Sequence, residues 1–71
     1  MSTENMEFPL LSLTAARVNI NLTQKEFAKK CGVSESTVIA WESGKRSPNL
    51  RMLNTIESVL GISLDFVRIG K

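Results

Sequence analysis

Apolar residues recur every three or four positions along most of the chain, the spacing of helices that bury one face. No stretch alternates regularly enough between apolar and polar residues to predict a strand. The pattern therefore predicts an all-α domain, a compact five-helix bundle preceded by a flexible arm at residues 1–9. Within the domain at residues 10–71, the helices are expected at about residues 12–20, 24–31, 35–43, 48–60 and 64–68.

Capping signals mark several of the expected helix ends. Thr23 followed by Glu26 has the form of a capping box, in which each side chain bonds the backbone amide of the other residue. Ser47 followed by Pro48 is typical of an N-cap and the first residue of a helix, so the fourth helix is expected to begin at Pro48. Asn21 suits the left-handed residue that closes a helix.

The inward face of each helix supplies the predicted core. Cys31 and Trp41 lie at or beside apolar helix positions, so both are expected to pack rather than to react or bind a ligand. The other inward positions are Leu13, Ala16, Arg17, Ile20, Phe27, Ala28, Val38, Leu50, Leu53, Ile56, Leu60, Leu64 and Val67.

The composition is that of an ordinary globular protein. Of the 71 residues, 42% are hydrophobic and 23% charged, enough for one small domain with its own core. No apolar run approaches the roughly 18 residues of a membrane span, and the first residues lack the basic start of a secretion signal. We therefore expect a cytoplasmic protein with no membrane partner.

The titratable residues argue against catalysis and against a metal site. One cysteine and no histidine leave no ligand set for a zinc finger and no nucleophile–histidine pair. Glu35 and Glu42 are seven residues apart with no accompanying base, metal ligand or phosphate loop. The chain is therefore predicted not to be an enzyme, and no cofactor is expected.

The positive charge lies in the middle of the chain. The net charge is +2, with residues 1–22 contributing −1 and residues 52–71 contributing zero. Residues 23–51 contain six lysines or arginines and three glutamates, a sum of +3. A basic partner-binding surface is therefore expected in this segment.

A short turn divides this basic segment. Gly32–Ser34 separates the helices expected at 24–31 and 35–43, and so tight a turn holds two helices at a steep angle, as a helix-turn-helix requires. Ala28 is small enough to let the second helix cross close to the first. The outer face of the second helix then remains free for a major groove about 12 Å wide.

Four short segments at fixed offsets make this motif specific. They are Leu22–Ala28 (LTQKEFA), Gly32–Ser34 (GVS), Trp41–Lys45 (WESGK) and Pro48. In these segments the chain resembles the helix-turn-helix domain of the phage repressor and Cro family, over roughly residues 12–67. The resemblance implies a five-helix fold of the lambda-repressor type. It also implies a prokaryotic or phage Cro-like repressor of a genetic switch, which regulates transcription by binding double-stranded operator DNA in the host cytoplasm.

The resemblance also implies roles for individual residues. Phosphate contacts would come from Gln24, Ser43, Lys45 and Arg46. Base edges would be read from Glu35, Ser36, Ile39 and Ala40, and Thr37 on the same helix is a further predicted DNA-binding residue. A partly buried salt bridge between Arg17 and Glu42 would tie the first helix to the third.

The predicted reading helix has an unusual outer face, because it lacks the arginine, lysine, asparagine and glutamine that most often read bases. Glu35 can accept from cytosine N4, and Ile39 or Ala40 can contact a thymine methyl group. Glu35 would also face the phosphates and weaken non-specific attraction. A second hypothesis therefore stays open, a protein-interaction module such as an anti-repressor that binds a phage repressor and blocks its DNA-binding helix. A weak homodimer on DNA is a further expected assembly.

Overall fold

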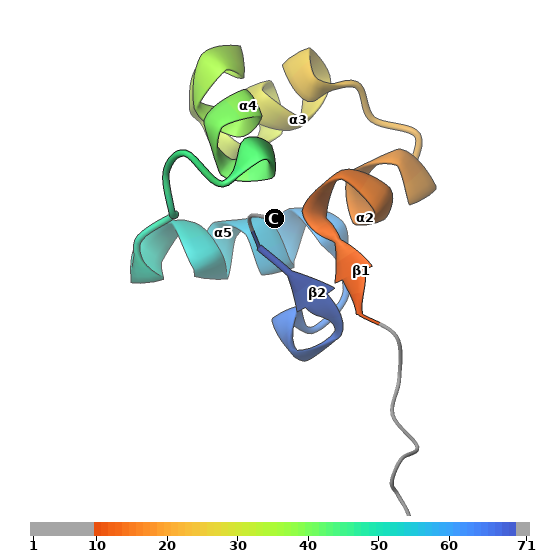
Figure 1. Cartoon of the computed structure of the whole chain (residues 1–71). Helices are drawn as coiled ribbons and strands as arrows, with labels where there is room; N and C mark the ends of the chain where they lie inside the picture. The colour runs from red at the N-terminus through yellow and green to blue at the C-terminus, as the bar shows by residue number, and fades with distance from the viewer. Residues whose placement is uncertain (1–9, 70–71) are drawn as a thin grey trace, which may run out of the picture.

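The computed structural model describes residues 10–69, which form four α-helices, one 3₁₀ helix and two short strands (Figure 1). The elements are, in chain order, β1 (Leu11–Ser12), α2 (Leu13–Asn19), α3 (Gln24–Cys31), α4 (Glu35–Ser43), α5 (Leu50–Leu60), η1 (Leu64–Phe66) and β2 (Val67–Arg68). The described chain is mostly helical, as predicted. The arm expected at residues 1–9 lies outside the described residues.

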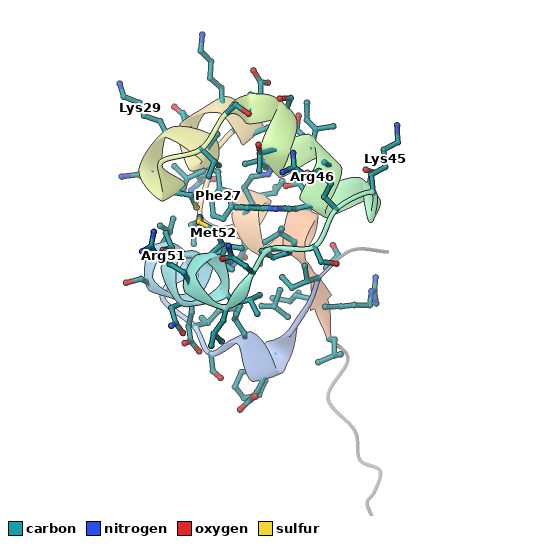
Figure 2. The ribbon with its side chains drawn as sticks, turned by 90° about the vertical axis from the view of Figure 1, so that its left-hand side faces the viewer. Phe27, Lys29, Lys45, Arg46, Arg51 and Met52 are labelled. Atoms are coloured by element: carbon teal, nitrogen blue, oxygen red, sulfur yellow. The ribbon has the colours of Figure 1, made fainter. Side chains whose placement is uncertain are left out.

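One core joins the four α-helices. Its four largest fully buried side chains are Leu13 from α2, Phe27 from α3, Val38 from α4 and Ile56 from α5. Met52 of α5 packs against this core from below Phe27 (Figure 2). The remaining buried apolar residues are Ala16, Ala28, Cys31, Trp41, Leu60 and Val67, so Cys31 and Trp41 are packing residues as predicted.

Local capping explains where α3 begins. The Thr23 hydroxyl accepts from the backbone N–H of Glu26 at 3.0 Å, and the Glu26 carboxylate accepts from the backbone N–H of Thr23 at 2.8 Å. The predicted capping box is therefore confirmed, and it satisfies two backbone donors that a helix start leaves free. Asn21 has a φ of 62°, which confirms the predicted left-handed residue after α2.

The predicted start of the fourth helix at residue 48 is wrong. The N-cap of α5 is Asn49, whose side-chain oxygen accepts from the backbone N–H of Met52 at 2.9 Å. Residues 47–49 have no helical structure and carry the chain from the end of α4 to α5. Because the helix begins at Leu50, that side chain lies in the first turn and is 74% exposed, so its predicted place in the core is also wrong.

Two further predictions are wrong, and both concern the C-terminal part of the described chain. Residues 64–68 do not form a full helix, and two short strands are present. Only Leu64–Phe66 is helical, as one 3₁₀ turn, and the chain then extends as β2. β2 pairs in parallel with β1, with Leu11 opposite Val67 and Ser12 opposite Arg68. The residues at 67–68 bond to a segment more than fifty positions earlier, and this non-local pairing replaces the last turn of helix (Figure 1).

Candidate nucleic-acid interface

The turn between α3 and α4 is closed by backbone hydrogen bonds. Gly32 has a φ of 77°, a conformation that glycine adopts without strain, and the N–H of Val33 donates to the Ala28 carbonyl at 3.0 Å. The Ser34 hydroxyl then accepts from the backbone N–H of Thr37 at 3.2 Å and caps α4. The two helices therefore follow each other at the end of the molecule away from the strands (Figure 1).

The inward face of α4 is buried. Val38 is fully buried and Trp41 is 3% exposed, both in contact with the cluster that includes Phe27. Ala28, 2% exposed on α3, offers no side chain that would keep the helices apart. Apolar packing of this density fixes the rotation of α4 about its own axis.

A buried ion pair ties α4 to α2. The Nε of Arg17 donates to Glu42 at 2.7 Å, and the two side chains are only 10% and 7% exposed. A second guanidinium nitrogen of Arg17 donates to the carbonyl of Leu22 at 2.7 Å. The structure thus contains the salt bridge that the family resemblance implies, and it links α2, the loop before α3, and α4.

The environment of Glu42 keeps this carboxylate ionised. Burial would raise its pKa, but hydrogen bonds from Arg17, Gln24 and Thr14 and the charge of Arg17 together hold the pKa below its usual value. The buried guanidinium therefore faces a negative partner throughout the neutral pH range. Such an arrangement restricts α4 to one position relative to α2.

Gln24 takes part in the same network, which the sequence did not reveal. Its side-chain N–H donates to Glu42 at 2.9 Å, so the first residue of α3 also bonds to the end of α4. The amide group has a second N–H, which this bond leaves available. No sequence signal connects the two residues, because they lie on different helices and 18 positions apart.

The outward face of α4 carries most of the predicted base-reading residues. Glu35, Ser36 and Ile39 are exposed, whereas Thr37 and Ala40 are half-buried. Ile39 is 44% exposed at the middle of the helix. The structure thus brings these five residues together on α4, with Thr37 at the edge that turns toward the core.

The loop after α4 holds two cations against the end of that helix. The backbone N–H groups of Lys45 and Arg46 donate to the Ala40 carbonyl at 3.0 and 3.2 Å. The Ser43 hydroxyl donates to the same carbonyl at 3.2 Å. Lys45 projects from one side of the molecule, whereas Lys29 of α3 projects from the other (Figure 2). The main chain that carries these two exposed basic side chains is therefore held against the C-terminal end of α4.

Residues 10–69 contain neither a candidate metal site nor a candidate membrane-spanning helix. No three carboxylate or cysteine side chains in this part of the chain gather closely enough to hold a metal ion. Nor does any helix there have both the length and the apolar character needed to cross a membrane.

A family model described as helix-turn-helix matches residues 13–67 of the chain. The match spans every α-helix described above and reaches the first residue of β2. It therefore includes both the buried network around Glu42 and the outward face of α4.

Several known proteins are similar to the chain. An uncharacterised helix-turn-helix-type transcriptional regulator of Methanocaldococcus jannaschii is 44% identical over 45 residues, which are 63% of this chain and 68% of that protein. The transcriptional activator BcrR of Enterococcus faecalis is 34% identical over 59 residues, 83% of this chain but only 29% of the activator. A putative multi-protein-binding factor 1 of Yarrowia lipolytica is 39% identical over 59 residues, 83% of this chain and 39% of the factor.

Proposed function

Because the chain belongs to the Cro-like helix-turn-helix family, we propose that it binds double-stranded DNA sequence-specifically and so regulates transcription. One observation carries the proposal. The inward face of α4 is fixed by Val38, Trp41 and Glu42, while its outward face is exposed and ends beside Lys45 and Arg46. A rigid helix with an accessible face and adjacent cations suits insertion into a major groove.

In the proposed complex, α4 lies in the major groove and its flanks contact phosphates. Lys45 and Arg46 neutralise phosphate charge beyond the end of α4. Gln24 stands at the N-terminus of α3, where the partial positive charge of the helix favours an anion, and donates its remaining N–H to a phosphate. Glu42 thereby orients a phosphate-binding side chain as well as α4 itself.

We further propose that regulation occurs by repression in a prokaryotic or phage setting. A domain bound in the major groove of a promoter blocks polymerase without any further contact. Two copies bound to a palindromic site would place their α4 helices one DNA turn apart. The test uses a reporter gene downstream of a DNA site that the protein has selected from a random duplex library. Expression of the reporter should fall when the protein is produced, and a rise in expression would contradict repression.

The salt dependence of binding tests the proposed phosphate contacts. A DNA site is first selected from a random duplex library, and its affinity is measured by fluorescence anisotropy at several salt concentrations. Lys45→Ala and Arg46→Ala should each weaken binding to every sequence and reduce the slope of log affinity against log salt by about 1. Lys29→Ala, which removes a cation from the other side of the molecule, is the matched control (Figure 2).

Two results would contradict the proposal. An unchanged affinity in the Lys45→Ala, Arg46→Ala double variant would show that this loop does not contact DNA. Failure of the wild-type protein to enrich any sequence at low salt would contradict sequence-specific binding as a whole.

A second candidate function is binding of a basic protein surface. It is favoured by the exposed carboxylate of Glu35 and the absence of lysine and arginine on α4, and by the likeness to a factor named for binding proteins. Glu35→Lys separates the two candidates. The change should tighten non-specific DNA binding if α4 faces DNA, and it should slow association with a basic repressor protein from the same genome if α4 faces that protein.

A further inference from the structure

The outward face of α4 has few hydrogen-bond donors. The side chains that project from it are those of Glu35, Ser36, Ile39, Ala40 and Ser43. None of them is an arginine, lysine, asparagine or glutamine, which make the common two-point contacts with guanine or adenine. Base recognition by this face must therefore use other chemistry.

Most of the hydroxyl hydrogens near this face are engaged within the protein. The Ser34 hydroxyl lies 3.0 Å from that of Ser36 and 2.9 Å from that of Thr37, so two of the three hydroxyl hydrogens are used among these residues. The Ser43 hydroxyl donates to the Ala40 carbonyl at 3.2 Å. One hydroxyl hydrogen of the three remains, together with the Glu35 carboxylate, which makes no hydrogen bond or ion pair within residues 10–69, and the apolar Ile39 side chain.

Ile39 occupies the centre of the face. It is 44% exposed, one turn after Glu35, whereas Val38 and Trp41 beside it are buried. A single exposed isoleucine is unremarkable on most surfaces, but this one stands where the proposed complex would bring base edges. The C5-methyl group of thymine is the one apolar group that the major groove displays.

We propose that α4 selects thymine by its methyl group, which Ile39 contacts, and that Glu35 accepts a hydrogen bond from the N4 amino group of a neighbouring cytosine. The inference rests on the proposed function and specifies its ligand, a half-site with a thymine and a neighbouring cytosine that face α4. Glu35 also discriminates against guanine and thymine at its own position, because both present acceptor oxygens to a carboxylate. Sequence preference in this protein thus depends on one apolar contact and one acceptor.

Replacement of thymine by deoxyuridine tests the methyl contact, because it deletes the methyl group and preserves base pairing. Binding of the selected duplex and of its fully substituted counterpart is measured by anisotropy. Wild-type protein should lose about fourfold in affinity for each methyl group that Ile39 contacts, as expected for removing one buried methyl group.

Two variants test whether Ile39 causes the affinity difference between the thymine and uracil duplexes. Ile39→Ala should bind both duplexes with similar affinity, since it lacks the side chain that the methyl group touches. Its fold is expected to persist, because Ile39 lies outside the buried core and alanine favours helices. Lys45→Ala, which alters only a proposed phosphate contact, should keep the full preference for thymine over uracil.

The outcomes separate this inference from the function on which it rests. Equal wild-type affinity for the two duplexes, with a sequence still selected, overturns the methyl contact and leaves DNA binding intact. A thymine preference that persists in Ile39→Ala overturns the assignment to Ile39. Failure of wild type to select any sequence overturns the proposed function and this inference together.

Discussion

The two faces of α4 differ in how strongly the rest of the molecule constrains them. On the inward side, Val38 and Trp41 are buried and Glu42 bonds to residues of both α2 and α3. On the outward side, Glu35 and Ile39 are exposed. Within α4, the residues that position the helix are thus distinct from those proposed to read bases. Substitutions on the inward face should change stability, and those on the outward face should change binding alone.

The largest expected effect is on the inward side, at the ion pair. Arg17→Ala leaves the Glu42 carboxylate buried without its charged partner, so it should lower the free energy of unfolding by about 3–5 kcal/mol. Urea denaturation followed by circular dichroism measures the change. A loss below about 1 kcal/mol would mean that the pair behaves like an exposed surface salt bridge.

The pH dependence of stability should reveal the same pair. The pKa of Glu42 is lowered in the folded protein, so its ionised form stabilises the fold above the ordinary pKa of about 4.5, and this contribution is lost as pH falls through the folded value. Glu42→Gln removes the titration. The difference in unfolding free energy between wild type and Glu42→Gln should therefore shrink as pH falls from 6 toward the acid limit.

A constant difference across that range would contradict this role for Glu42. Glu26 does not disturb this comparison, although its pKa is also lowered, chiefly by the hydrogen bond from the backbone N–H of Thr23. Its contribution is present in both proteins and cancels in the difference.

A smaller effect is expected at the cap of α3. Thr23→Ala removes the acceptor for the backbone N–H of Glu26 and should destabilise the domain by about 1 kcal/mol. Thr23→Ser keeps the hydroxyl and is the matched control, with stability close to wild type in the same denaturation experiment. Equal loss in both variants would mean that the hydroxyl does not contribute.

The smallest stability effect is expected on the outward face of α4. Glu35→Ala should change the free energy of unfolding by less than about 0.5 kcal/mol, because Glu35 is exposed and unpaired among the described residues. A loss comparable to that of Arg17→Ala would remove the distinction between the two faces.

The elements that could be predicted from the sequence are those whose signals are local. The capping box of Thr23 and Glu26 and the turn at Gly32–Ser34 lie within a few residues of the helices they delimit, so α3 and α4 follow from the pattern. The pairing of Leu11 with Val67 has no local signal, because its two partners meet only in the folded chain. Ser47 and Asn49 are both good caps, and only the path from α4 selects Asn49 for α5.

In the candidate site, too, features with local sequence signals could be predicted and contacts between distant residues could not be derived from the pattern. The outward residues of α4 follow from helical spacing once the turn is recognised, and their roles in DNA binding stay predictions. The Arg17–Glu42 pair was expected from the family resemblance, since no periodicity links residues 25 positions apart. The bond from Gln24 to Glu42 was missed for the same physical reason, because it depends on how α3 and α4 cross.

The most direct test of the central claim, that the outward face of α4 and its flanks contact DNA, is a nuclear magnetic resonance titration. The selected duplex is added to uniformly ¹⁵N-labelled wild-type protein, and the shift of each backbone amide is recorded. We expect the largest shifts at Gln24, along Glu35–Ser43 and at Lys45 and Arg46, with little change at Val67 in the strand pair. Shifts concentrated at the strands or on α5, with α4 unaffected, would contradict the claim.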